Sequence, residues 1–309
     1  MRGTLHLVEV SLSVFGVIGN LIFLICLSKT ASTSTQCARK VLFINIAQCV
    51  LDLLACSAYL PSALDLSKDY PSTFVCRIIN TRVPFWIFIN YRGFLNTYNA
   101  LWQHTRIVYP FWSTVLNSPT GCTFILTLSS LMNILQSYAF TRLGDFANEP
   151  IAHCLPNCID CQSGDQAGLN SLAVLCSTVY RFVLPIMIMM VTFDHLTEIL
   201  SDCEGTVYQH LCKQLRVSAL LDVKLYAITL LTHELLFLMN AFVLVTEFTL
   251  DSFPYKLACL VSLCYPVLCP CLSIGLRSVN YMPGIEAVLR PTDYQKLGKL
   301  AMMWRTTRS

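Results

Sequence analysis

The sequence predicts an all-α, polytopic membrane protein: a bundle of seven transmembrane helices with the N-terminus outside and the C-terminus inside. Seven stretches, each of about twenty mostly apolar residues, divide the chain. Charged residues make up 13% of the sequence, about half of the roughly 25% found in soluble proteins. Because hydrocarbon offers no hydrogen-bond partners to a bare backbone, each stretch is expected to be a helix. The number and length of these stretches argue against the alternative, a soluble protein with buried helices.

The expected spans form a single membrane domain over residues 1–276. They cover approximately residues 5–27, 41–64, 78–103, 121–140, 170–193, 219–246 and 257–276. The uncharged apolar runs are Val10–Leu27, Gly121–Phe140 and Leu257–Leu276. The other four runs carry an ionisable residue or an adjacent pair: Asp52 in Val41–Leu64, Arg92 in Val83–Gln103, Arg181 in Asn170–Phe193, and His233 with Glu234 in Leu225–Thr246. Residues 277–309 are expected to form a cytoplasmic tail.

The distribution of Lys and Arg residues sets the expected orientation, because these residues favour the cytoplasmic side. With the N-terminus outside, thirteen of the 21 fall in inner segments and six, including Arg82, in outer segments; Arg92 and Arg181 lie within spans. Acidic residues from Asp194 to Asp222 crowd the inner segment that leads into span six, but they contribute little to this rule. We therefore expect a multi-pass plasma-membrane protein whose first span is an uncleaved anchor.

Four of the sixteen cysteines are expected on the oxidising outer side, where disulfides form. Cys76 precedes the third span, and Cys154, Cys158 and Cys161 lie in the loop between spans four and five. A disulfide from Cys76 to Cys154, or instead to Cys158 or Cys161, would staple this loop over the third helix. Zinc binding by Cys158 and Cys161 with His153 is the alternative. Cysteines within spans are expected to be small apolar packing residues.

Five short motifs occur in order in the expected spans. They are Gly19-Asn20 in span one, Leu51-Asp52-Leu53-Leu54 in span two, Cys76 before span three, Phe182-Val183-Leu184-Pro185 in span five, and Cys269-Pro270-Cys271-Leu272-Ser273 in span seven. Together they resemble the motifs of rhodopsin-like (class A) G-protein-coupled receptors. The chain looks like a divergent invertebrate member, similar to nematode or flatworm chemoreceptors and peptide receptors. The resemblance also implies a short membrane-parallel helix in the tail, which we expect to be weak or shifted because Pro283-Gly284 interrupts it.

The segment that would face the G protein departs from the family pattern. Counted back from Pro110, the family's Asp-Arg-Tyr motif corresponds here to Trp102, Gln103 and His104. The resemblance therefore places Gln103 where the family has the arginine that engages the G protein, with Arg106 one helical turn away. The chain also lacks the tryptophan of span four, the Cys-Trp-x-Pro toggle of span six, and the asparagine and tyrosine of span seven. These departures keep open a receptor-like protein that has lost G-protein coupling.

Asp52 and Arg92 are the strongest candidates for a polar network inside the membrane. An ionisable residue at the bilayer midplane costs roughly 2.5–3.5 kcal/mol on insertion scales and faces the bundle interior. Both residues lie near the middle of their spans. The resemblance implies that Arg92 replaces the sodium ion that the family holds beside the span-two aspartate, so we expect a buried Asp52–Arg92 ion pair in a network with Asn20 and Glu234. The alternatives are that Arg92 pairs with Glu234 or snorkels along a water-filled cleft.

The resemblance places the ligand site among spans three, five, six and seven. Arg181 lies on the face of span five that contacts ligands in the family, and its guanidinium suits a carboxylate or other anion. The alternatives for Arg181 are a structural partnership with Glu234 or with a helix carbonyl. Phe85 takes the position where amine receptors have an aspartate, which disfavours a biogenic-amine ligand. With Trp86 and Ile89 it would form an apolar, aromatic wall, although core packing or an interface belt is the alternative for Trp86.

These observations predict a receptor that senses an extracellular small molecule or short peptide and signals to a heterotrimeric G protein. No nucleophile–base constellation or phosphate loop suggests an enzyme, span seven has no lysine for retinal, and we expect no cofactor. His233 and Glu234 are expected to be a polar pair between helices, because no second histidine follows to complete a metal motif. The basic tail favours a membrane surface over nucleic acid. A transporter or channel is the alternative, although the odd span number and the lack of a repeat count against it.

Overall fold

The fold is helical throughout the part of the chain that the computed structural model describes. These residues are 2–33, 36–64, 79, 82–109, 127, 130–131, 175–201, 206–241 and 253–278. Within them every residue except Leu64, Arg82 and Tyr109 is helical, and no strand occurs. The all-α prediction is therefore confirmed for these ranges.

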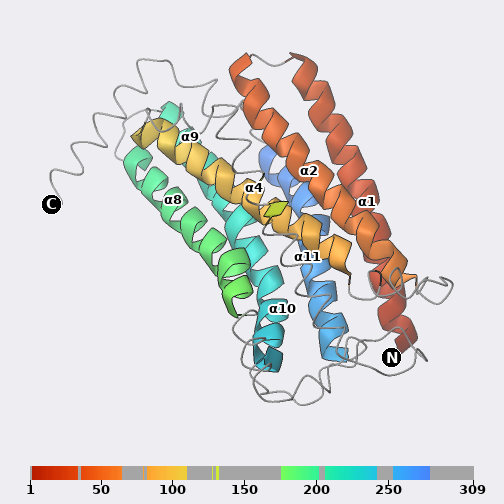
Figure 1. The fold of residues 1–309 in the computed structure, drawn as a ribbon. Helices are drawn as coiled ribbons and strands as arrows, with labels where there is room; N and C mark the ends of the chain where they lie inside the picture. Colours follow the sequence, from red (N-terminus) through yellow and green to blue (C-terminus); the bar gives the residue numbers. More distant parts are fainter. Residues whose placement is uncertain are drawn as a thin grey trace.

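Six of the seven expected spans overlap described helices. The helical elements are α1 (Arg2–Thr33), α2 (Gln36–Ala63), α4 (Val83–Val108), η3 (Val179–Val183), α8 (Leu184–Ser201), α9 (Thr206–Ser218), η4 (Ala219–Leu225), α10 (Tyr226–Ala241) and α11 (Phe253–Ser278) (Figure 1). The fourth expected span, 121–140, lies almost entirely outside the described residues. Helix also extends beyond the apolar runs, because α8 continues to Ser201 and α9 begins at Thr206. Much of the segment expected between spans five and six is therefore helical.

The described helices pack side by side as a bundle. Helix α1 packs against α2 and α11, α2 packs against α4, α4 packs against α8, and α10 packs against α11. The starts of α1, α4 and α11 and the ends of α2 and α10 lie at the same end of the bundle, the lower end in Figure 1. Helix α4 crosses the others diagonally, which lets it contact helices on both sides (Figure 1).

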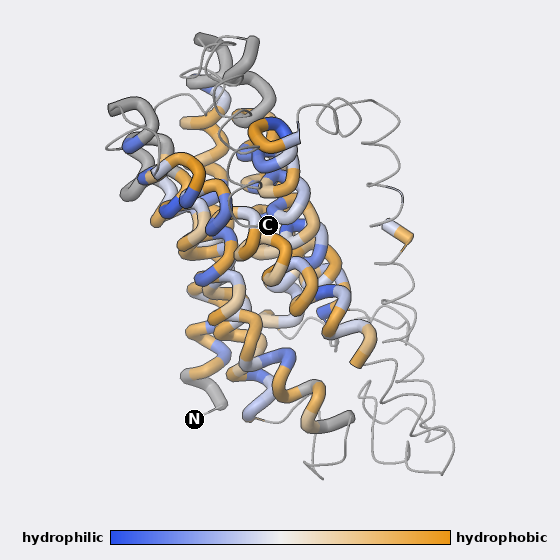
Figure 2. Tube along the Cα trace, turned by 90° about the vertical axis from the view of Figure 1, so that its left-hand side faces the viewer, coloured by the Kyte–Doolittle hydropathy of each residue, from blue (hydrophilic) through white to orange (hydrophobic). Residues whose placement is uncertain are grey.

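The surface of the bundle is apolar, and its interior is partly polar. Large apolar side chains are exposed along α1, α8 and α10; Phe15 is 55% exposed, Val191 63% and Ile228 68%. Figure 2 shows hydrophobic residues distributed along much of the length of the bundle. Within the described ranges, four helical segments are long and apolar enough to cross a membrane: Leu5–Lys29, Leu42–Ala63, Leu175–Ser201 and Phe253–Ser273. Continuous apolar surface of this extent is typical of contact with a membrane.

Helix α4 is long enough to span a membrane but carries more polar residues than those four segments. Its 26 residues include Asn90, Asn96 and Asn99, which are buried together with Arg92. Polar residues in a membrane helix face the protein interior, where other side chains meet their hydrogen-bonding needs. The polar composition of α4 thus reflects its position between α2 and α8.

Two turns of π-helix rotate buried charges into the interior. In η3 the Leu184 N–H bonds to the Val179 carbonyl, one residue further back than in an α-helix. Pro185 follows directly and has no N–H to donate to the carbonyl four residues earlier in the helix. The wide turn accommodates this missing α-helical hydrogen bond. As a result the adjacent residues Arg181 and Phe182 are both buried. The second wide turn, η4, similarly buries three consecutive residues, of which the central one is Asp222.

Gly16 and Gly19 in α1 offer a matched pair of substitutions. A Cβ at Gly16 would lie 2.5 Å from Cys56 Sγ and 2.8 Å from Val267 Cγ2, whereas one at Gly19 would lie 4.0 Å from Cys271 Sγ. We expect Gly16→Ala to destabilise the bundle by about 1–3 kcal/mol through overpacking. Gly19→Ala should leave stability unchanged or slightly raised, because alanine favours the helix. Thermal unfolding of the detergent-purified variants measures the difference, and equal stability of the two variants would contradict this packing of α1.

Candidate functional site

Three buried pairs of a carboxylate and a guanidinium connect the described helices. The pairs are Glu9 with Arg82, Asp52 with Arg92, and Glu234 with Arg181. Each of the six side chains is at most 5% exposed. A buried charge without a partner is strongly destabilising, whereas a hydrogen-bonded pair is tolerated. Each pair therefore fixes two elements relative to each other.

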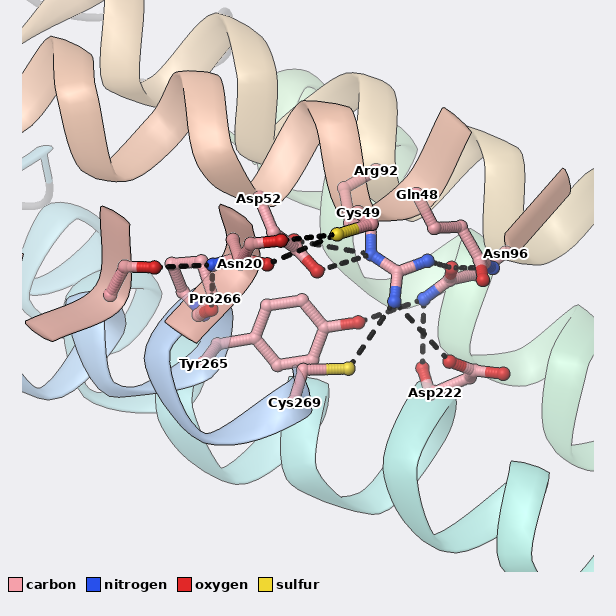
Figure 3. A network of polar contacts seen from close by, with 11 residues as sticks. Asn20, Gln48, Cys49, Asp52, Arg92, Asn96, Asp222, Tyr265, Pro266 and Cys269 are labelled. Carbon is pink, nitrogen blue, oxygen red and sulfur yellow. Dashed lines mark hydrogen bonds and ion pairs between the residues drawn. The ribbon is translucent and has the colours of Figure 1, made fainter. Parts of the chain in front are cut away.

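Asp52 and Arg92 form a buried ion pair in the interior of the bundle (Figure 3). Arg92 Nε donates to both carboxylate oxygens of Asp52, each at 3.2 Å. Arg92 Nη1 donates to Asn96 Oδ1 at 2.5 Å, and Nη2 donates to Cys269 Sγ at 3.3 Å. One guanidinium thus joins α2, α4 and α11.

Asp222 brings a second carboxylate to the same guanidinium. Its Oδ1 lies 3.7 Å from Arg92 Nη2 and accepts no hydrogen bond. With both carboxylates ionised, the cluster of Asp52, Arg92 and Asp222 carries one positive and two negative charges. The sequence grouped Asp222 with the acidic residues of an inner segment, because its apolar neighbours did not show that η4 turns it inward. We call these three residues the central triad.

Asn96 links the central triad to neighbouring helices. Its Nδ2 donates to the Tyr265 hydroxyl at 3.0 Å, and its Oδ1 accepts from Gln48 Nε2 at 2.8 Å (Figure 3). All three side chains are at most 3% exposed. The Oδ1 atom of this amide accepts from both Arg92 and Gln48 of α2, while its Nδ2 donates to Tyr265 of α11, so Asn96 joins Arg92 to both helices. The sequence did not single out Asn96, although it lies one helical turn after Arg92 on α4.

Asn20 supplies a hydrogen bond that a proline removes from α11. Pro270 has no N–H, so the Pro266 carbonyl lacks its α-helical donor. Asn20 Nδ2 donates to this carbonyl at 2.9 Å and to the Gly16 carbonyl at 2.9 Å. Cys49 Sγ in turn donates to the Asn20 backbone carbonyl at 3.2 Å. The expected network residue Asn20 therefore joins α1, α2 and α11 beside the central triad (Figure 3).

Glu234 lies in a separate pair rather than beside Arg92. Arg181 Nη2 lies 2.7 Å from both Glu234 carboxylate oxygens, and His233 Nδ1 lies 3.4 Å from Glu234 Oε1. The pair joins η3 to α10. Arg181 thus pairs with Glu234, the structural alternative to a ligand anion, and its guanidinium is already engaged.

The predicted aromatic wall lies in the core. Phe85 and Ile89 are at most 1% exposed, and Trp86 is 8% exposed. Phe85 packs edge-to-face against Trp86, and the Trp86 ring lies 3.7 Å from the His233 ring, measured between centroids. These three residues line the inner face of α4 towards α2 and α10.

The residues expected to face the G protein lie near the end of α4, at the opposite end of the bundle from its start. Gln103, His104 and Arg106 are all half-buried. Gln103 Nε2 donates to Asn99 Oδ1 at 3.1 Å, on the same helix. His104 Nε2 lies 2.8 Å from His195 Nδ1, which ties α4 to α8.

The Glu9–Arg82 pair was missed by sequence reasoning. Arg82 Nη2 donates to Glu9 Oε1 at 3.1 Å, and Arg82 Nε donates to Ser62 Oγ at 3.1 Å. The sequence counted Arg82 among the outer basic residues and gave Glu9 no role. The available signal was that Glu9 is the single acidic residue in expected span 5–27, where an unpaired carboxylate would be strongly unfavourable.

The predicted disulfide and its zinc alternative fall outside the described residues, since Cys76, His153, Cys154, Cys158 and Cys161 all lie there. The described part of the chain contains no group of three or more His, Cys, Asp or Glu residues that could hold a metal ion. Its span cysteines include four buried ones, Cys49, Cys56, Cys259 and Cys269, while Cys26, Cys176 and Cys271 are exposed.

No protein-family model and no curated protein matches this chain. The resemblance to rhodopsin-like receptors therefore depends on the motifs within the sequence.

The central triad predicts an unequal response to removing its charges. Arg92→Leu leaves two buried carboxylates without a counter-charge, and we expect a loss of about 3–5 kcal/mol in stability. Asp52→Asn should cost less, because Asp222 remains beside Arg92, and the double variant should be more stable than Arg92→Leu alone. Unfolding of detergent-purified protein tests this order, with the exposed Arg216→Leu as a control expected to change stability by less than about 0.5 kcal/mol. A double variant no more stable than Arg92→Leu would exclude the pairing.

Proposed function

We propose that the chain is a receptor of the rhodopsin-like type. It crosses the plasma membrane seven times with its N-terminus outside, senses an extracellular small molecule or short peptide, and signals to a heterotrimeric G protein. The central triad is the observation that carries this proposal. It brings together the span-two aspartate and the span-three position that the family uses for a cation, and it adds a carboxylate from the sixth expected span.

The direction of the helices supports seven spans. Helix α4 ends at the upper end of the bundle in Figure 1, and the helix that contains η3 and α8 starts at the lower end. The expected span 121–140, which lies almost entirely outside the described residues, would account for this change of ends. Together with that span, the six described helices would alternate in direction as a seven-span bundle requires.

The central triad supplies a physical means of signalling. A ligand changes the balance between two arrangements of a protein only if it binds one of them better. Arg92 faces Asp52 on α2 and Asp222 on η4, so a shift of η4 and α10 relative to α4 alters the guanidinium's partners. Polar contacts that can be exchanged in this way make a bistable element within an otherwise close-packed bundle.

Coupling to the G protein is assigned to the end of α4. Gln103, His104 and Arg106 lie there, with Gln103 in place of the family's arginine. The His104–His195 contact joins this end to α8. A receptor-like protein without G-protein coupling is the corresponding alternative, and a signalling readout separates the two.

The buried charges also give a second candidate, a transporter. Ionisable residues inside a membrane protein mark ion and proton pathways as well as structural pairs. The second carboxylate of the central triad is the specific observation in its favour. Uptake of labelled solutes or protons into proteoliposomes that contain the purified chain distinguishes a transporter from a receptor.

Epitope tags at the two ends test the proposed topology. On intact cells, an antibody should reach an N-terminal tag but not a C-terminal tag, because inner segments hold most Lys and Arg residues. Permeabilisation should expose both. Access to both tags on intact cells would rule out an odd number of spans.

Ligand screening with arrestin recruitment or whole-cell mass redistribution tests the receptor function. For any active ligand, we expect Asp222→Asn to shift the half-maximal concentration by roughly 5- to 150-fold, the usual range of coupling between sites. The exposed Asp194→Asn on α8 is the matched control and should leave potency unchanged at equal surface expression. Equal potency of wild type and Asp222→Asn would remove the central triad from signalling, and solute flux without any ligand response would favour the transporter.

A further inference from the structure

Aromatic side chains surround the guanidinium of Arg82 at the lower end of the bundle. The Arg82 Cζ atom lies 4.6 Å from the centre of the Tyr59 ring and 5.8 Å from that of Tyr255. Phe85 packs edge-to-face against Tyr59 at 5.1 Å and against Trp86 at 4.9 Å, between ring centres. All four aromatic residues are at most 8% exposed. Together with Glu9, we call Tyr59, Phe85, Trp86 and Tyr255 the cation cage.

The cage contains one oriented carboxylate. Glu9 is 4% exposed, and its Oε1 accepts from the Tyr59 hydroxyl at 2.9 Å and from Arg82 Nη2 at 3.1 Å. A desolvated carboxylate beside aromatic faces is the chemistry that recognises guanidinium and ammonium groups. The sequence disfavoured an amine ligand because Phe85 replaces an aspartate on the third span. The structure instead provides the carboxylate from α1, through the tyrosine that packs on Phe85.

Arg82 fits the cage imperfectly. Its Nη1 is buried and has no hydrogen-bond partner. Its backbone is left-handed, with φ 55° and ψ 29°, and it is the only described non-glycine residue with positive φ. Such a conformation is uncommon outside glycine and is maintained by surrounding contacts. An organic cation that satisfies Glu9 without this backbone strain can therefore compete with the Arg82 side chain.

The cage lies near the ends of helices rather than in the middle of the bundle. Arg82 immediately precedes α4, Tyr255 is in the first turn of α11, and Tyr59 is in the last turns of α2. In the proposed orientation this end of the bundle faces outwards. Arg82 lies at the helix boundary, so a change in the backbone or side-chain dihedral angles of this one residue can move its side chain out of the cage.

We infer that the cation cage is a binding site for a small organic cation, a guanidinium or ammonium compound, and that Arg82 is its built-in competitor. The assignment names a ligand class for the receptor proposed above and rests on that function for its outward exposure. When the cation binds Glu9, Arg82 leaves the cage, and the contacts among α1, α2, α4 and α11 rearrange. Cation binding is thereby linked to α2 and α4, which also carry Asp52 and Arg92 of the central triad.

The test measures thermal unfolding of the detergent-purified full chain with added methylguanidinium or agmatine. Arg82→Ala should lower the unfolding temperature, and methylguanidinium should restore it in a saturable manner because it fills the vacated cage. The neutral isostere methylurea should have no effect, and neither should methylguanidinium on the double variant Glu9→Gln, Arg82→Ala. If Arg82→Ala does not fold, Arg82→Gln serves in its place, because it removes the charge but keeps much of the side-chain volume.

Wild type decides whether Arg82 is a competitor or a permanent partner. Because Arg82 occupies the cage for most of the time, wild type should bind the same cation at least about tenfold more weakly than Arg82→Ala, but still saturably. No response in wild type, or rescue of Arg82→Ala that survives Glu9→Gln, would overturn the inference. The measurement needs no signalling, so its failure leaves the receptor proposal standing, and a failed signalling screen leaves a positive binding result intact.

Discussion

The need to neutralise Arg92 inside an apolar bundle organises the rest of the structure. The apolar surface of α1, α8 and α10 leaves a guanidinium no route to solvent along these helices, so its donors must be met by protein atoms. Asp52, Asn96 and Cys269 meet them from two neighbouring helices and from α4 itself. These contacts fix the positions of α2, α4 and α11 along the bundle axis and determine which face of each of these helices points inwards. The close contacts of Gly16 with Cys56 and Val267 then become possible, because the helices are already held in register.

Irregular helix geometry is what allows charged residues to reach the interior. A regular α-helix exposes its faces with a period of 3.6 residues, and a π-turn shifts that period by one residue. The wide turns η3 and η4 direct Arg181 and Asp222 towards the interior, although neighbouring turns of the same helices expose apolar side chains on the bundle surface. In α11, Pro270 has the converse effect, because it frees a carbonyl that a polar side chain from α1 then binds. Wide turns and prolines therefore contribute polar groups to the interior that the hydropathy pattern alone does not predict.

Residues that lie at matching depths could be predicted from the sequence, whereas residues that depend on local backbone geometry could not. Asp52 and Arg92 are each central in an apolar run, so their meeting follows from depth and from the high free energy of an unpaired charge. Asp222 escaped notice because its burial depends on a wide turn that has no clear signature in a single sequence. The Glu9–Arg82 pair depends on a left-handed arginine at the start of α4, a conformation that side-chain chemistry does not favour. The helices themselves were predictable, but their ends were less so, because helix continues past the apolar runs into polar segments.

The order of the charged partners along the chain bears on how the protein is assembled. Glu9 and Asp52 belong to the first two helices, and the arginines that neutralise them come later, Arg82 immediately before α4 and Arg92 within it. Both pairs are therefore complete once the chain has been synthesised as far as Arg92, so its N-terminal part carries both charges of each pair before the rest follows. Arg181, by contrast, precedes Glu234 in the chain. The third pair is complete only after α10 has been synthesised.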